Sequence, residues 1–311
     1  MKYLEHIMET ENKINYKKHL GHFIKPCPCS PSKLRCSYHI ITPAVGCPFD
    51  CSYCFLNFYS KDNNITIYTN IDDMFKELDE FLIARKGLAT RIGTGEFMDS
   101  LAIEELDKIN IKLANTIIAD GTAIIEFKTK SKRIEQLLTI PAHKNIVVSW
   151  SLNPQSVIDT EEPLTASLKE RLDCAKTIAK HGHSLAFHLD PIFMEDELLK
   201  EYVDLINKVM ESVPASKIRW ISMGGFRYTE DLKLCMLEKN GLKKTYLCGE
   251  FIRCEDGKFR YPRYKRVKFY NAIGNTIKKH GAVKTYMCME DSDLWRHIDF
   301  DNKKVLSMLH T

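Results

Sequence analysis

Between about residues 38 and 225, short runs of strand character alternate with helical patterns, and this alternation limits the fold more than any other feature of the sequence. Strand runs separated by helices are typical of a mainly parallel sheet with crossover helices. The runs are nearly continuous in apolar character, as expected of strands covered on both faces. They are YHIITPAV (38–45), ATRIG (89–93), AIIEFKT (123–129), NIVVSWSL (145–152), SLAFHL (184–189) and KIRWISM (217–223).

Helical patterns lie between these runs, near 72–86, 100–118, 131–139, 164–181 and 195–212. The pattern at 164–181 is the clearest, because its apolar residues fall on one face and Gly182 stands where a left-handed C-cap belongs. The residues of that face are Leu164, Leu168, Leu172, Ala175, Ile178 and Ala179. Six such units predict an α/β fold with a partial (β/α)6 TIM-like barrel, and a doubly wound open sheet is the alternative.

This interpretation divides the chain into three segments: residues 1–37 as an N-terminal extension, 38–225 as the barrel and 226–311 as a C-terminal cap. In parallel α/β folds, the chemistry collects in the loops beyond the C-terminal ends of the strands. The distinctive polar residues of the chain stand at those ends, at Cys47–Cys54, Gly93–Glu96, Lys130, Ser149–Asn153, and His188 with Asp190.

The 311-residue chain has an ordinary globular composition, with 44% hydrophobic and 28% charged residues. Its N-terminus, MKYLEHIMETENK, lacks the apolar core of a signal peptide, and no run reaches the roughly 18 apolar residues of a membrane span. Eleven cysteines, an odd number in a large chain without an export signal, argue against a disulfide framework. We therefore expect a cytoplasmic protein with no membrane partner and with reduced cysteines, some of which bind metal. The net charge of +4 says little about partners.

Three cysteines, Cys47, Cys51 and Cys54, stand close together in the stretch GCPFDCSYCFL, directly after the first strand run. A structural zinc site would need a fourth ligand, such as Cys27, Cys36 or a histidine. A dithiol redox motif would use only Cys51 and Cys54 and leave Cys47 unexplained. A cubane iron–sulfur cluster takes four thiolates, and with three of them one iron keeps an open coordination position.

The C-x₃-C-x₂-C spacing, with Tyr53 before the last cysteine, resembles the cluster motif of the radical S-adenosylmethionine enzymes. That superfamily has an incomplete β/α barrel with the motif after its first strand. The resemblance implies a [4Fe-4S] cluster on Cys47, Cys51 and Cys54, with S-adenosyl-L-methionine chelated to the open iron. One electron, supplied by a donor such as flavodoxin or ferredoxin, then breaks the sulfonium C–S bond. The resulting 5′-deoxyadenosyl radical abstracts a hydrogen atom from the substrate.

Most of the chain also resembles the spore photoproduct lyase family of radical enzymes. The matching stretches, in common order, are KPCPCS (25–30), CSYHI (36–40), GCPFDCSYCFL (46–56), EFKTKS (126–131), SWSLNPQSVIDTEEPLTASLKERLDCAKTIAKHG (149–182) and HLDPI (188–192). This resemblance implies a lyase-like repair of DNA, in which a substrate radical lets 5-thyminyl-5,6-dihydrothymine fragment back to two thymines.

One departure from the family concerns the end of the reaction. The lyase carries a cysteine just beyond the second strand, and this cysteine returns a hydrogen atom to the product radical. The corresponding stretch here, GTGEFMDS (93–100), contains no cysteine, and the position falls at or near Glu96. Either another group, such as Tyr53, Cys174 or Cys235, quenches the radical, or the substrate differs. Of these, Cys174 stands at a packing position of its helix.

Five residues are expected to contact S-adenosylmethionine: Tyr53, Glu96, Lys130, Ser151 and Asp190. The stretch RIGTGEFMD resembles the Gly-Gly-Glu element of the superfamily, which implies that Glu96 accepts from the cofactor ammonium; an acid at a helix N-terminus is the alternative. The family match implies that Lys130 and Ser151 bind carboxylate or ribose oxygens, although such residues are commonly just solvated. Asp190 either faces the adenosine or is a turn residue.

The segment KFRYPRYKRVK (258–268) interleaves six basic residues with three aromatic ones, and Arg260, Tyr261, Arg263, Tyr264 and Lys265 are its candidates for contact with DNA or another nucleic acid. Cations suit phosphates, and aromatic rings suit the stacking of single-stranded or flipped bases. The alternative is a helix entry with Pro262 in the first turn, a solvated basic face and packed tyrosines.

Two further functions stay open from the sequence. One is a radical enzyme acting on a small molecule, peptide or RNA, and the other is a non-catalytic metal-binding module. Cys27, Cys29 and Cys36 could bind a second metal or simply pack as reduced cysteines. The C-terminal cysteines, such as Cys288, have no recognisable ligand spacing.

Overall fold

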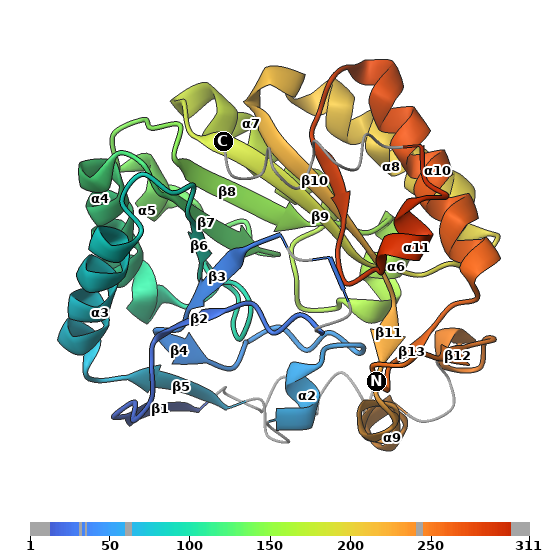
Figure 1. The fold of residues 1–311 in the computed structure, drawn as a ribbon, viewed down its shortest axis with the longest axis horizontal. Coiled ribbons are helices and arrows are strands. Elements are labelled where there is room, and N and C mark those ends of the chain that lie inside the picture. The colour runs from blue at the N-terminus through green and yellow to red at the C-terminus, as the bar shows by residue number, and fades with distance from the viewer. Residues whose placement is uncertain (1–12, 31–32, 35, 60–63, 241–244, 300–311) are drawn as a thin grey trace, which may run out of the picture.

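A curled, open sheet of eight strands organises the computed structural model, which describes residues 13–30, 33–34, 36–59, 64–240 and 245–299 (Figure 1). The strand order is β14-β10-β9-β8-β7-β6-β3-β2. Neighbours from β3 to β14 are parallel, and only β2 runs antiparallel, along β3. The fold is therefore the partial β/α barrel that the sequence predicts. The strands are β2 (Ile24–Pro26), β3 (Tyr38–Ile41), β6 (Arg91–Gly93), β7 (Ile124–Thr129), β8 (Ile146–Ser151), β9 (Ser184–Ile192), β10 (Ile218–Gly225) and β14 (Thr285–Met287).

The first predicted strand, 38–45, is wrong in its extent, because the run divides into two strands. β3 ends at Ile41, and β4 (Ala44–Val45) instead pairs with β5 (Ile65–Tyr68), which also pairs with β1 (Ile14–Lys17) in a second sheet. Pro43 lies between the two strands and has no N–H to donate to a ladder, so the run changes sheets there. β2 and β14 were not predicted, since three residues carry too little pattern.

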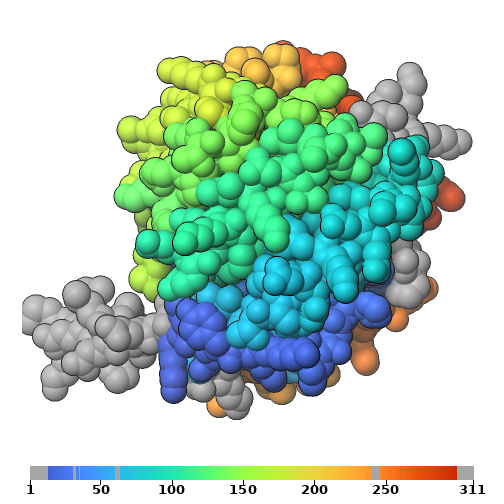
Figure 2. Space-filling model, turned by 90° about the vertical axis from the view of Figure 1, so that its left-hand side faces the viewer, coloured from blue at the N-terminus to red at the C-terminus, as the bar shows by residue number. Residues whose placement is uncertain are grey.

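The crossover helices cover the outer face of the sheet. Figure 2 shows part of that face, where segments follow one another in sequence order from blue at the bottom to yellow at the top, as successive crossovers require. The helical elements between the strands of the barrel are α3 (Ile71–Ala84), η1 (Glu104–Leu106), α4 (Asp107–Asp120), α5 (Glu135–Leu138), α6 (Gln155–Glu161), α7 (Leu168–His181), α8 (Leu198–Ser212) and η2 (Ala215–Lys217).

Helix α7 begins later than the sequence pattern predicts. Ser167 is its N-cap and forms a capping box with Glu170, so the helix starts at Leu168. Leu164 therefore lies outside the helix and is 45% exposed, which corrects its assignment to the apolar face. The C-terminal prediction is confirmed, because Gly182 has φ 113° and its N–H donates to the carbonyl of Ile178.

The C-terminal segment contributes both to the sheet and to the surroundings of its open side. It supplies β14 and a small sheet in the order β11-β13-β12, and α10 packs against α8 (Figure 1). Its elements are β11 (Arg227–Tyr228), α9 (Glu230–Asn240), η4 (Thr245–Leu247), β12 (Ile252–Arg253), β13 (Phe259–Arg260), α10 (Arg263–His280), β14 and α11 (Ser292–Trp295). The division of the chain at residues 37 and 225 stays a prediction. Among the described helices, none has both the length and the apolar character needed to span a bilayer.

Candidate active site

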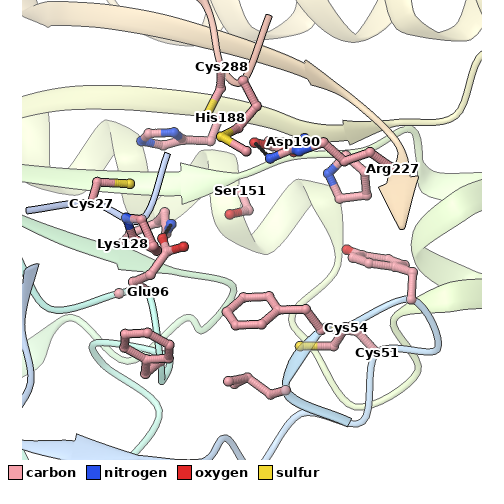
Figure 3. Close-up of a pocket in the computed structure, with 18 of the residues that line it drawn as sticks. Cys27, Cys51, Cys54, Glu96, Lys128, Ser151, His188, Asp190, Arg227 and Cys288 are labelled. Atoms are coloured by element: carbon pink, nitrogen blue, oxygen red, sulfur yellow. Dashed lines mark hydrogen bonds and ion pairs between the residues drawn. The ribbon is translucent and has the colours of Figure 1, made fainter. Parts of the chain in front are cut away.

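A cavity of about 640 Å³ opens at the C-terminal ends of the barrel strands. Figure 3 shows its walls, with Cys51 and Cys54 on one side and Cys27 and Cys288 on the other. All eight residues predicted to hold the cluster and the cofactor line this cavity: Cys47, Cys51, Tyr53, Cys54, Glu96, Lys130, Ser151 and Asp190. The fold thus brings together residues from separate segments of the chain, as expected for a parallel α/β site.

The three-cysteine loop begins at a position that only glycine can occupy. Gly46 has φ 98°, and a Cβ added there would lie 2.4 Å from the carbonyl oxygen of Asn64. Its N–H donates to the carbonyl of Phe97 at 2.9 Å, which ties the loop to the segment after β6. The loop then carries Cys47, Cys51 and Cys54 into the pocket before α2 (Leu56–Tyr59) begins.

The thiols of this loop fit a cluster better than a single metal ion. Burial raises the pKa of Cys47, Cys51 and Cys54, so each would need a bound metal to lose its proton. Within the described residues, no group of three or more His, Cys, Asp or Glu side chains is placed to hold one ion. A cubane places its thiolate ligands on different irons, and three thiolates on one pocket wall suit that arrangement.

Tyr53 anchors the loop to the barrel. Its hydroxyl donates to Glu162 Oε1 at 2.5 Å, and Arg171 Nη2 contacts Glu162 Oε2 at 2.7 Å, with both of these ionic side chains fully buried. The Lys130 ammonium lies 5.5 Å from the centre of the Tyr53 ring. Although burial alone would lower the pKa of Lys130, Glu162 raises it, so a positive charge stands beside the cluster loop.

The opposite walls carry the other predicted cofactor residues. Glu96 pairs with Lys128 at 3.4 Å, and Gly95 allows this approach because a Cβ there would lie 2.6 Å from the Lys128 Cβ. Asp190 accepts two hydrogen bonds from Arg227, at 2.9 and 3.2 Å. Burial alone would raise the pKa of Asp190, but the guanidinium lowers it. Asp190 lies inside β9 rather than in a turn, which corrects the turn interpretation.

The sequence did not predict a buried polar network behind the pocket. Glu126 is 1% exposed and contacts Arg91 Nη2 at 2.7 Å and His188 Nε2 at 2.6 Å. The other ring nitrogen of His188 lies 2.6 Å from the Ser222 hydroxyl. The guanidinium of Arg91 also lies 3.9 Å from the Trp220 ring. The available signal was a charged residue in the middle of an apolar strand run, since such a residue needs a buried partner.

A second group of cysteines lines the same pocket: Cys27, Cys29, Cys36 and Cys288. They come from the segment between β2 and β3 and from the residue after β14, so no local spacing reveals them. The Cys29 thiol donates to the Cys27 sulfur at 3.6 Å. Within the described residues, no cysteine forms a disulfide.

The basic segment 258–268 lies largely outside the pocket. Arg260 is 2% exposed and forms two 2.7 Å contacts with Asp256, and Tyr261 is equally buried. These positions correct the expectation that both side chains reach a nucleic acid. Arg263 and Tyr264 are exposed and Lys265 is half-buried, and their role stays a prediction. From this segment, Lys258 lines the pocket.

The partial barrel and the three-cysteine loop beyond its first strand define a radical S-adenosylmethionine enzyme. Residues 24–290 match the model of the spore photoproduct lyase family, and the chain belongs to that family. It is 26% identical over 238 residues to the spore photoproduct lyase of Clostridium acetobutylicum, covering 76% of this chain and 69% of the relative. It is 25% identical over 247 residues to the lyase of Bacillus subtilis, covering 78% and 71%.

Solved structures agree with this fold. A spore photoproduct lyase complexed with dinucleoside spore photoproduct superposes with a TM-score of 0.77 at 21% identity, covering 90% of this chain and 83% of that one. A mutant spore photoproduct lyase with bound AdoMet and the same dinucleoside also gives 0.77 at 21% identity, covering 92% and 84%. The chain is therefore an enzyme that uses a [4Fe-4S] cluster and S-adenosylmethionine, and the non-catalytic module is ruled out.

Proposed function

We propose that this enzyme cleaves a thymine photoproduct of the spore photoproduct class in DNA. The observation that supports it best is one pocket with three thiols on one wall and paired ionic groups on the others. A cavity of about 640 Å³ falls in the range of ligand pockets and has room for a nucleobase beside a cofactor.

We assign Cys47, Cys51 and Cys54 as cluster ligands. Glu96 would bind the ammonium of S-adenosylmethionine, and Tyr53, Lys130, Ser151 and Asp190 would contact its remaining polar groups. When bound, cluster and cofactor supply the radical that abstracts hydrogen from the substrate. The Glu96 carboxylate suits a cation, because it already accepts from the Lys128 ammonium.

The pocket also carries groups suited to a nucleobase and a phosphate. Phe55, Phe97 and Phe226 are among its lining residues, and aromatic rings of this kind stack on extruded bases. Lys258 also lines the pocket, where an ammonium can contact the phosphate that joins two thymidines. Arg227 is already held by Asp190, so it positions that carboxylate rather than the phosphate.

The reduced thiols and the need for an electron bear on the compartment of the enzyme and on its electron donor. The thiols must stay reduced, so we propose a cytoplasmic enzyme that receives electrons from a low-potential protein such as flavodoxin or ferredoxin. The three-cysteine loop leads directly into α2, where Tyr59 is 71% exposed, which puts the loop next to a surface that a donor can reach.

An anaerobic assay tests the proposed substrate. Reconstituted protein receives S-adenosylmethionine, dithionite and either dinucleoside spore photoproduct or a labelled peptide, RNA or small-molecule candidate. The proposal expects conversion of the photoproduct to the thymidine dinucleoside, together with 5′-deoxyadenosine. Formation of 5′-deoxyadenosine without any conversion of the photoproduct would overturn the proposed substrate and favour one of the other substrate classes.

A further inference from the structure

The proposed reaction ends on a substrate radical that must receive a hydrogen atom. The segment after β6, residues 93–100, offers no cysteine for this step. Carboxylates such as Glu96 hold no weakly bonded hydrogen, so that segment alone cannot complete the reaction. Within the described residues, Cys174 and Cys235 do not line the pocket, and the Cys174 thiol donates to the carbonyl of Lys132 on the outer side.

Cys27 lies close to Glu96, the residue of the segment after β6 at or near which the cysteine of the lyase falls. Figure 3 shows it beside Glu96 and Lys128, with its sulfur directed toward the interior of the pocket. The Glu96 carboxylate is close enough to act on the Cys27 thiol electrostatically. The backbone of Cys27 is fixed, because its N–H donates to the carbonyl of Tyr38 in β3 at 2.8 Å.

The protonation state of Cys27 suits hydrogen-atom transfer. Only a thiol has a hydrogen atom to give, whereas a thiolate has none. The close contact with the Cys29 thiol, and then burial, raise the pKa of Cys27, so the sulfur keeps its proton at neutral pH. This is the opposite of the low pKa that a nucleophilic cysteine needs.

Cys36 and Cys288, two other thiols of the pocket, are less well placed. Cys36 lies deeper, where Arg91 and Glu126 act on it. Cys288 lies on the same side of the pocket as Cys27, but it stands beside Asp190 and Arg227, whose charges act on it (Figure 3). The loop cysteines are already committed to the cluster. Of Cys27, Cys36 and Cys288, Cys27 is the thiol on which the Glu96 carboxylate of the segment after β6 acts.

We propose that Cys27 is the hydrogen-atom donor that ends the reaction, an assignment that rests on the proposed function. Cleavage of the bond between the two thymines leaves an unpaired electron on the methylene carbon of one thymine. The Cys27 S–H bond breaks and a C–H bond forms, which completes the methyl group and leaves a sulfur-centred radical. One electron from the flavodoxin- or ferredoxin-class donor and one proton restore the thiol.

Deuterium from solvent tests this step, because a thiol exchanges its hydrogen with D2O. The unmodified enzyme is expected to place one deuterium in the methyl group of the repaired dinucleoside. Cys27→Ala is expected to lose that label and to form at least about ten-fold less repaired product, with other thymine products in its place, while 5′-deoxyadenosine still forms. Cys174→Ala, outside the pocket, should behave as the unmodified enzyme.

Two results would overturn the assignment. In one, Cys27→Ala repairs the lesion and keeps the label. In the other, the label is lost in Cys36→Ala or Cys288→Ala and kept in Cys27→Ala. If the unmodified enzyme yields no repaired dinucleoside, the proposed function itself fails and the assignment with it, so the two failures are distinct.

A measurement without the cofactors gives an independent readout. Hydroxyl-radical footprinting of the protein before reconstitution, followed by mass mapping, should show that dinucleoside spore photoproduct protects Cys27 and leaves the modification of Cys174 unchanged, because this oxidant attacks a protonated thiol as well as a thiolate. Equal modification of Cys27 with and without the photoproduct would contradict contact between them. Thermal unfolding of Cys27→Ala should match that of the unmodified protein, which separates a chemical role from a structural one.

Discussion

Two groups of cysteines face the same pocket and differ in how the chain assembles them. Cys47, Cys51 and Cys54 come from one loop, and their spacing alone predicts their chemistry. The second group (Cys27, Cys29, Cys36 and Cys288) comes from two ends of the chain and meets only because β2 and β14 join the barrel sheet. A local motif can therefore predict a metal centre from the sequence, whereas the thiols opposite it are recognised only once the fold is known.

Each group is backed by a buried carboxylate–arginine pair. Glu162 and Arg171 lie behind the loop, and Glu126 and Arg91 lie behind the second group, with all four side chains at most 3% exposed. Both carboxylates also hold a pocket residue, Tyr53 in the first case and His188 in the second. The pocket is thus rigid on both sides, although only one side binds metal in this account.

The largest effect is expected from a loop cysteine. Cys51→Ala should abolish iron–sulfur binding and 5′-deoxyadenosine formation, because two thiolates do not hold the cluster. Cys288→Ala, from the second group, should keep the full iron content. Iron and sulfide analysis after anaerobic reconstitution measures both variants. Equal iron loss in the two would erase the distinction between the groups.

Breaking the pair behind the loop should destabilise the fold strongly. Arg171→Met leaves the Glu162 carboxylate buried without its ion partner, which costs about 3–5 kcal/mol of unfolding free energy. Lys169→Met removes a surface ion pair with Asp173 and should change stability little. Urea unfolding followed by circular dichroism compares them. A similar, small effect of both variants would show that the buried pair does not hold the loop wall.

Acid should destabilise the fold through the two buried carboxylates behind the pocket, Glu126 and Glu162. Burial alone would raise the pKa of Glu126, but Arg91 and His188 lower it below the ordinary 4.5. The pKa of Glu162 is lowered in the same way, by Lys130 and Arg171. Carboxylates with a depressed folded-state pKa stabilise the fold above the unfolded value, so stability should fall as the pH drops below about 4.5. Urea midpoints at neutral pH and at about pH 4 and below measure this. The Glu126→Gln variant is expected to lose less stability in acid than the unmodified protein. An equal loss of stability in both proteins would show that Glu126 does not contribute to the acid effect.

Glu96 lies between the two groups and should contribute to cofactor affinity. Glu96→Gln removes the charge opposite the cofactor ammonium, and a charge-assisted hydrogen bond of about 1.5 kcal/mol corresponds to roughly ten-fold weaker binding. Equilibrium dialysis of S-adenosylmethionine with the reconstituted protein gives the affinity. Unchanged binding would place the ammonium elsewhere in the pocket.

The smallest effect is expected outside the pocket, on the basic segment. The double variant Arg263→Ala with Lys265→Ala should weaken oligonucleotide binding a few-fold and reduce its salt slope by up to about 2, since each phosphate contact releases about one counterion. Lys169→Ala, on the surface of α7, is the matched control. Identical slopes for all three proteins would assign the segment a purely structural role.

The sequence predicted what is encoded locally. The strand runs, the left-handed cap at Gly182 and the three-cysteine loop all depend on residues close in the chain, and each appears in the structure. The start of α7 was placed too early, because the capping box at Ser167 outweighs the apolar periodicity that includes Leu164.

The features that the sequence did not predict depend mostly on contacts between distant segments. Glu126 and His188 meet across the barrel sheet, and Cys288 reaches the pocket only through the pairing of β14 with β10. Arg260 pairs with Asp256 only four residues earlier, but the fold around them buries both side chains, so its charge suggested a surface that the fold does not expose. Register and strand order are set by packing over the whole sheet, and no single stretch contains them.

Electron paramagnetic resonance of the reconstituted, reduced protein tests the central claim most directly, which is that three thiolates leave one iron open to the cofactor. The account predicts about four iron and four sulfide per chain and a [4Fe-4S] signal that changes when S-adenosylmethionine is added. Zinc in the loop, or a cluster signal that the cofactor leaves unchanged, would contradict it.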